Sequence, residues 1–115
     1  MKSFGNTLRN IRRARSISQR DLAHKVGVDF SYISKLENGR IPPPSADTIV
    51  KISEALSVEP AVLLSLTGKL PSEVKEMLGG SLAALEFLTE AKSLSLREKD
   101  WKSLTKRLKQ LRSQA

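Results

Sequence analysis

The side chains best suited to chemistry lie between residues 30 and 35, where aromatic, hydroxyl and ammonium groups follow one another. Four of them share the side of this segment that faces away from its apolar positions: Phe30, Ser31, Ser34 and Lys35. The apolar pair Ile33 and Leu36 stands three residues apart, as on the inward face of a helix. Hydroxyl and ammonium groups donate hydrogen bonds, so the outward side offers binding chemistry that fits the groove of a nucleic-acid duplex.

Two short helices joined by a tight turn must position this outward side. Ser18 is a good N-cap, so a helix is expected from Gln19 onward. Gly27 accepts the positive φ that ends a helix, and Asp29 then restarts the chain as the next N-cap. Because the turn is so short, the crossing of the two helices is fixed, and the second helix is expected over residues 29–39.

Further helices support this pair on both sides. Apolar residues at i, i+4 and i+7 predict a first helix over about residues 4–15. Three consecutive prolines at 42–44 end the pair and hold an extended connection. Ser45 then caps a fourth helix, and Pro60 opens a short fifth helix. We therefore expect an all-α first domain over residues 1–67.

A second helical unit is expected over residues 68–115. The spacing of Ser95 and Glu98 predicts a capping box that begins the last helix. A set of apolar residues at helical spacings indicates faces that pack against another helix, and these are the candidates for dimerisation: Leu85, Leu88, Trp101, Leu104, Leu108 and Leu111. The same stripe is also compatible with a core inside one subunit.

Composition excludes several classes of protein. The 115 residues include no cysteine and one histidine, which excludes thiolate chemistry and a histidine-rich metal site. Paired carboxylates, a nucleophile with its base and a phosphate-cradling glycine loop cannot be assembled, so we expect neither an enzyme nor a cofactor. No apolar run approaches the roughly 18 residues of a transmembrane helix, so a cytoplasmic protein without a membrane partner is expected.

The charge is basic and unevenly placed. The formal net charge of +8 favours a polyanionic partner, although charge alone does not separate DNA from RNA or an acidic membrane surface. Residues 1–40 hold nine Lys and Arg against three Asp and Glu, whereas residues 41–66 hold one against three. The basic character of the first domain therefore belongs to its first three helices.

Several spaced features together resemble one known family. The segments SQRDLAHKVGVDFSYISKLENGR, the upstream LRNIRRARSIS and the downstream PSADTIVKISEALSVEPAVLL are similar to the phage-repressor type (Cro/repressor-like, XRE) of helix-turn-helix DNA-binding domain, a five-helix fold. The resemblance covers about residues 4–66. It implies two phosphate ligands, Gln19 and Asn38. It also implies that three side chains face base edges: Ser31, Ser34 and Lys35.

For the remaining residues of the motif, either a structural role or a DNA-binding role is expected. Arg12 and Glu37 occupy positions that form an internal ion pair in several such domains. Phe30 departs from the polar residues common at its position, so it either contacts a thymine methyl group or packs locally. Tyr32 either packs or touches a phosphate. Arg40 follows the recognition helix, where it would meet the phosphate backbone.

The part after residue 69 resembles, more weakly, the small C-terminal domains of short stress-response and mobile-element repressors. Some of those proteins are inactivated by a partner metallopeptidase that cuts near this domain. If that property carries over, the junction at residues 93–97 is the candidate cleavage site. A loop between two helices is the simpler interpretation of the same residues.

These observations favour a sequence-specific DNA-binding transcriptional regulator, a repressor that binds a palindromic operator as a homodimer. One alternative is an antitoxin or accessory protein whose second unit binds a regulatory protein and whose DNA binding is autoregulatory. A second alternative is a coactivator-like or RNA-binding helical module, which would show no preference for a duplex palindrome.

Overall fold

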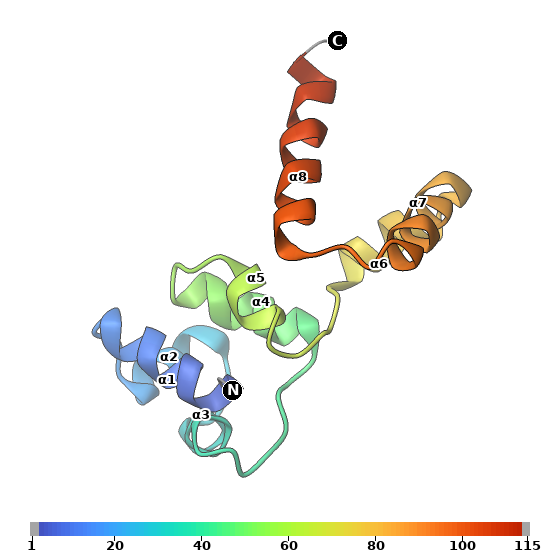
Figure 1. Ribbon diagram of the computed structural model, residues 1–115. Coiled ribbons are helices and arrows are strands. Elements are labelled where there is room, and N and C mark those ends of the chain that lie inside the picture. Colours follow the sequence, from blue (N-terminus) through green and yellow to red (C-terminus); the bar gives the residue numbers. More distant parts are fainter. Residues whose placement is uncertain (1–2, 114–115) are drawn as a thin grey trace. The chain divides into compact units, whose positions relative to one another are not determined.

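The computed structural model describes residues 3–113, and every regular element within that range is a helix (Figure 1). The eight helices are α1 (Phe4–Ala14), α2 (Gln19–Val26), α3 (Phe30–Glu37), α4 (Ala46–Ala55), α5 (Pro60–Leu64), α6 (Ser72–Gly79), α7 (Leu82–Ser93) and α8 (Glu98–Ser113). The all-α class predicted from the sequence is confirmed. None of the helices in this range is long and apolar enough to span a lipid bilayer.

The chain divides after Lys75 into two compact units. This division lies beyond the 67/68 boundary suggested by the sequence, because the stretch after α5 is bonded back to the first unit. The backbone N–H and the hydroxyl of Ser72 donate to the Asp47 carboxylate at 3.0 and 2.6 Å. Lys69 Nζ donates to two carbonyls of the proline loop 42–44, at 3.1 and 2.9 Å.

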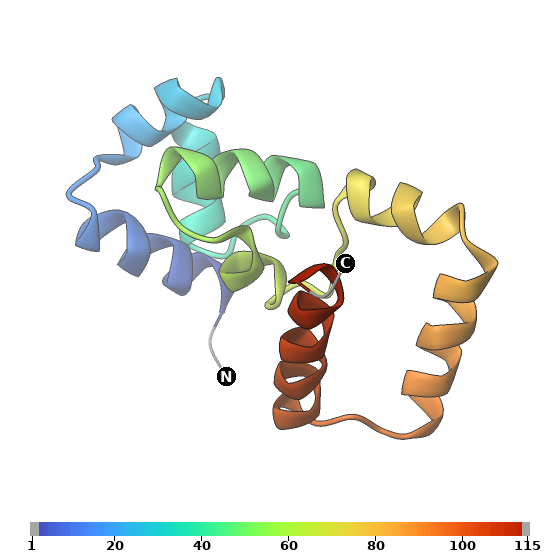
Figure 2. The same ribbon diagram turned by 90° about the horizontal axis from the view of Figure 1, so that it is seen from above.

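The first unit is built around one apolar core that all five of its complete helices share (Figures 1 and 2). α3 packs against both α1 and α2, while α4 contacts α2 and α5. The fully buried apolar side chains come from every one of these helices: Leu8, Leu22, Ile33, Leu36, Ile49, Ile52, Leu56 and Leu63. Burial of this set, at about 25 cal/mol per Å² of apolar surface, holds α3 against α1 and α2.

One glycine permits the close approach of α1 to the end of α3. A Cβ on Gly5 would lie 2.5 Å from the carbonyl oxygen of Leu36 and 2.6 Å from that of Glu37. Both obstacles are backbone atoms, so neither can rotate away. The position of the C-terminal turn of α3 therefore depends on a residue without a side chain.

The turn between α2 and α3 is set by its caps. The Ser18 hydroxyl accepts a hydrogen bond from the backbone N–H of Asp21 at 3.0 Å, as a helix N-cap does. Gly27 ends α2 in the left-handed conformation, with φ of 83°. Asp29 is the N-cap residue of α3 and has extended backbone, as expected, although its side chain makes no cap hydrogen bond.

The second unit has little core of its own. Among its described residues only Ala91 is buried, and α8 contains no buried residue. The capping box expected at Ser95 is wrong, because Ser95 has φ of 50° where an N-cap needs extended backbone. Asp100 supplies the bond instead, since its Oδ2 accepts from the backbone N–H of Arg97 at 2.9 Å.

Candidate nucleic-acid interface

The two sides of α3 differ sharply in burial. Ile33 and Leu36 are buried in the core. On the opposite side Ser31 and Lys35 are exposed, and the Phe30 side chain is 42% exposed. One side of α3 therefore carries hydroxyl, ammonium and aromatic groups that the protein itself does not cover.

A buried ion pair joins α1 to the end of α3. Arg12 Nε donates to Glu37 Oε2 at 2.7 Å, and Arg12 Nη2 donates to Glu37 Oε1 at 3.0 Å. Arg12 is 8% exposed and Glu37 is 2% exposed. The third guanidinium nitrogen, Nη1, donates to the carbonyl of Ile17 at 2.9 Å, which ties the same arginine to the start of the turn before α2.

Several donors converge on the Glu37 carboxylate and keep it ionised. Burial raises its pKa, but hydrogen bonds from Arg12 and Gln19 and the charges of Arg12 and Arg9 outweigh burial, so the pKa lies below its usual value. Gln19 contributes through Nε2, which donates to Glu37 Oε1 at 3.0 Å. One of the two amide protons of Gln19 is thus donated inside the protein.

Arg9 completes this network, and sequence reasoning missed it. Arg9 Nη2 donates to the Glu37 carbonyl at 3.2 Å and to Asn38 Oδ1 at 2.6 Å. With Oδ1 engaged, the Asn38 amide group presents Nδ2 toward Ser34, whose hydroxyl oxygen lies 3.4 Å away. The only sequence signal was the spacing of Arg9 and Arg12, which puts two guanidinium groups on neighbouring helix positions.

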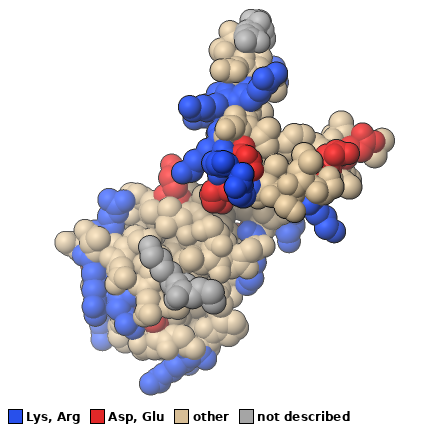
Figure 3. Space-filling view, viewed as in Figure 1, with Lys and Arg blue, Asp and Glu red and all other residues tan. Residues whose placement is uncertain are grey.

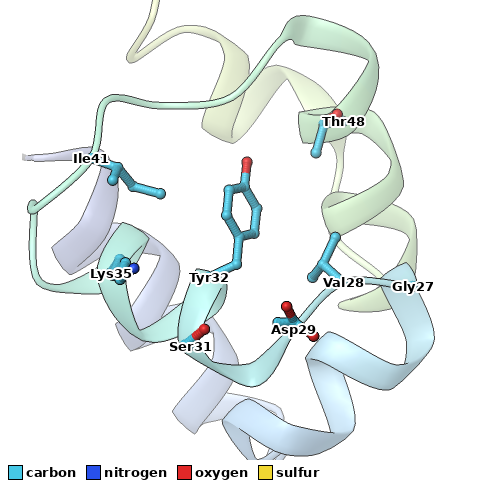
Figure 4. Close-up of a pocket in the computed structure, with 8 residues that line it drawn as sticks. All are labelled: Gly27, Val28, Asp29, Ser31, Tyr32, Lys35, Ile41 and Thr48. Atoms are coloured by element: carbon cyan, nitrogen blue, oxygen red, sulfur yellow. The ribbon is translucent and has the colours of Figure 1, made fainter.

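A cleft of about 750 Å³ lies beside α3 (Figure 4). The ring of Tyr32 points into it, between Ile41 of the following loop and Thr48 of α4, while Ser31 and Lys35 lie at its α3 edge. Burial raises the pKa of the Tyr32 hydroxyl above its usual value, so the group stays a neutral donor. Tyr32 is therefore placed for a contact beside α3, at the loop that carries Arg40.

Basic side chains are spread over both units. Figure 3 shows Lys and Arg along the rim of the first unit and along α8. From residue 97 to 112 the sequence holds seven Lys and Arg against two acidic residues. Within the described range no cluster of His, Asp and Glu could hold a metal ion. The chemistry offered by the first unit is thus hydrogen bonding and neutralisation of anionic charge.

An apolar groove of about 540 Å³ runs through the second unit. Four of the predicted dimerisation residues of α8 line it together with Leu88 of α7: Trp101, Leu104, Leu108 and Leu111. Leu85 is exposed but does not line the groove. Four further apolar residues line it that the predicted dimerisation set does not contain: Met77, Leu78, Ala84 and Phe87.

Two short helices crossing at a glycine turn, with an exposed polar side on the second, define a helix-turn-helix DNA-binding domain. A family model described as helix-turn-helix matches residues 8–63. The transcriptional repressor RghR of Bacillus subtilis is 34% identical over 112 residues, which span 92% of this chain and 82% of RghR. The chain belongs to the helix-turn-helix family of transcriptional regulators, and these are not enzymes.

Two solved structures have a similar fold. The DNA complex of SinR, a master regulator of biofilm formation, matches with a TM-score of 0.50 and 33% identity, covering 53% of this chain and 97% of the chain in that structure. The P22 c2 repressor bound to a synthetic operator matches with a TM-score of 0.52 and 29% identity, covering 57% of this chain and 98% of the chain in that structure. The resemblance inferred from the sequence is confirmed.

Proposed function

We propose that this protein is a sequence-specific transcriptional repressor that binds a palindromic DNA operator as a homodimer. The observation that carries the proposal is the exposed polar side of α3, backed by the buried Ile33 and Leu36. In helix-turn-helix proteins the second helix lies in the major groove and its first residues contact base edges. The SinR and P22 c2 structures, solved with DNA, support the same use of this fold.

The proposed contacts fall into two groups. Three side chains on α3 would read base edges: Ser31, Ser34 and Lys35. Phe30, at the start of α3, would contact a base from the same side. A second set would bind phosphates and fix the register on the duplex: Gln19, Tyr32, Asn38 and Arg40. The internal bonds of Gln19 and Asn38 support this assignment, because each uses part of its amide inside the protein and keeps at least one N–H available.

The second unit would supply the dimer. Its groove leaves large apolar side chains uncovered, with Trp101 41% exposed and Leu108 and Leu111 each 64% exposed. A palindromic operator offers two half-sites related by a twofold axis, so a second copy of this chain is the occupant that matches the DNA. Burial of apolar surface at about 25 cal/mol per Å² would stabilise that pairing.

Selection of bound sites from random duplex DNA by the full chain tests the proposal. We expect enrichment of a twofold-symmetric sequence with half-site centres about 34 Å, or roughly 10 base pairs, apart. Enrichment of a single asymmetric site would overturn the homodimer. Absence of any enriched duplex, with tighter binding to RNA, would favour the RNA-binding alternative and overturn the regulator mechanism.

A further inference from the structure

A cation near the start of α2 lies over an aromatic ring at the start of α3. The guanidinium carbon of Arg20 lies over the Phe30 ring, 4.8 Å from its centroid. Arg20 is the second residue of α2 and Phe30 is the first residue of α3. Both side chains are exposed, so they hold each other outside the core and on the surface proposed to meet DNA.

The contact with the Phe30 ring holds the guanidinium without a conventional hydrogen bond. The N–H groups of the guanidinium therefore stay available to an acceptor outside the protein. No acceptor within the described residues receives a hydrogen bond from Arg20, whereas Arg9 and Arg12 are both engaged. The Arg20 guanidinium is therefore held in position by the ring, and its N–H donors have no acceptor among the described residues.

The two groups are close enough together to face neighbouring base pairs. They lie 4.8 Å apart, which is more than the 3.4 Å rise of one base-pair step in B-DNA but less than two such steps. Phe30 stands at the N-terminal end of the recognition helix, where side chains reach base edges. An aromatic ring contacts the C5-methyl of thymine, and an arginine edge matches O6 and N7 of guanine.

We propose that Arg20 and Phe30 read adjacent thymine and guanine bases as one unit. Phe30 packs on the thymine methyl, and the Arg20 guanidinium, held over the ring, donates to O6 and N7 of the guanine. This inference rests on the proposed DNA-binding function and adds a base-reading residue, Arg20, from outside the recognition helix. It also specifies the base that Phe30 contacts, a thymine, through its methyl group.

The test uses the full chain and its selected operator in two modified forms. Deoxyuridine in place of thymine removes the methyl group, and 7-deazaguanine in place of guanine removes N7. We expect wild-type affinity to fall about fourfold with the first change and about tenfold with the second. Phe30→Ala should lose the sensitivity to deoxyuridine and weaken the sensitivity to 7-deazaguanine, because the ring that holds the guanidinium is gone. Arg20→Ala should lose the sensitivity to 7-deazaguanine and keep part of the sensitivity to deoxyuridine.

Lys51→Ala is the matched control, because it removes one exposed positive charge on α4, away from both residues, and should keep both sensitivities. Unfolding midpoints of all variants show that each remains folded. If wild-type protein binds the modified and unmodified operators equally, the proposal is overturned. It is also overturned if Arg20→Ala weakens every sequence alike while keeping its sensitivity to 7-deazaguanine, since Arg20 then binds a phosphate. Failure of the repressor assignment would appear earlier, as the absence of a selected operator.

Discussion

Arg12 and Glu37 are joined by two hydrogen bonds inside the first unit, at 2.7 and 3.0 Å. The pair links the first helix to the end of the helix proposed to enter the DNA groove. Its geometry is bidentate, which holds both side chains in one orientation. Because both groups are buried, removing one leaves the other as an uncompensated charge.

Glu37→Leu should lower the free energy of unfolding by about 3 kcal/mol, measured by urea denaturation. The loss arises because Arg12 stays buried without its carboxylate. The double variant Arg12→Met with Glu37→Leu should recover most of that stability, since two apolar side chains then fill the site. A double variant no more stable than Glu37→Leu alone would contradict this account.

Stability should fall at acid pH in a way that depends on Glu37. Its pKa is lower in the folded protein than in the unfolded chain, so the unfolded state binds more protons as pH falls. The stabilisation is fully present above the unfolded pKa of about 4.3 and is lost as pH falls through the lowered folded value. Urea midpoints between pH 2 and 7 should show a shallower acid loss for Glu37→Gln, while Glu59→Gln, at an exposed site, keeps the wild-type profile.

Gly5→Ala should destabilise the first unit by about 1–3 kcal/mol, because its Cβ would collide with two backbone carbonyls of α3. Gly79→Ala is the matched control. A Cβ there meets nothing within 4 Å, so the substitution should be neutral or stabilising by about 0.5 kcal/mol. Thermal unfolding of both variants provides the comparison. Equal midpoints would show that α1 does not approach α3 this closely.

Lys35→Ala and Gln19→Ala should affect DNA binding in different ways. Loss of Lys35 should relax base preference at one position of each half-site by about 1–3 kcal/mol. Loss of Gln19 should weaken binding to all sequences alike, because a phosphate contact carries no sequence information. Titration of a selected operator and its single-base variants separates the two. If the binding curves of both variants were unchanged, the proposal that α3 lies in the DNA groove would be wrong.

Leu108→Asp should yield monomers in sedimentation equilibrium, because it places a charge in the apolar groove of the second unit. Leu82→Asp is the matched control, since Leu82 is exposed in the same unit but does not line the groove. If the Leu108→Asp protein remained a dimer, the apolar residues of α8 would lie outside the subunit interface. A wild-type monomer would leave the groove to a different protein, as the accessory-protein alternative requires.

The sequence predicted the start of a helix correctly where the residue at that start is one that favours the position. Ser18 and Pro60 mark the starts of α2 and α5, and the apolar spacing of α3 places Ile33 and Leu36 in the core. The capping box at Ser95 failed because residue identity does not report the backbone angle. A serine in the left-handed conformation cannot act as an N-cap.

Contacts between distant segments were harder to predict from the sequence. Arg9 reaches Asn38 only because Gly5 lets α1 approach the end of α3, and no local pattern encodes that approach. The hydrogen bond from Gln19 to Glu37 likewise depends on packing between separate helices, here α2 against α3. The family resemblance supplied the Arg12 and Glu37 positions, but the additional donors around that carboxylate required the three-dimensional arrangement.

The bonds from Ser72 to Asp47 and from Lys69 to the proline loop have a practical consequence for dissecting the protein. The segment after α5 is bonded to Asp47 of α4 and to the proline loop that follows α3. A fragment cut at residue 67 would lose all of these hydrogen bonds. A fragment that keeps them must include Ser72, and one that matches the first compact unit ends at Lys75.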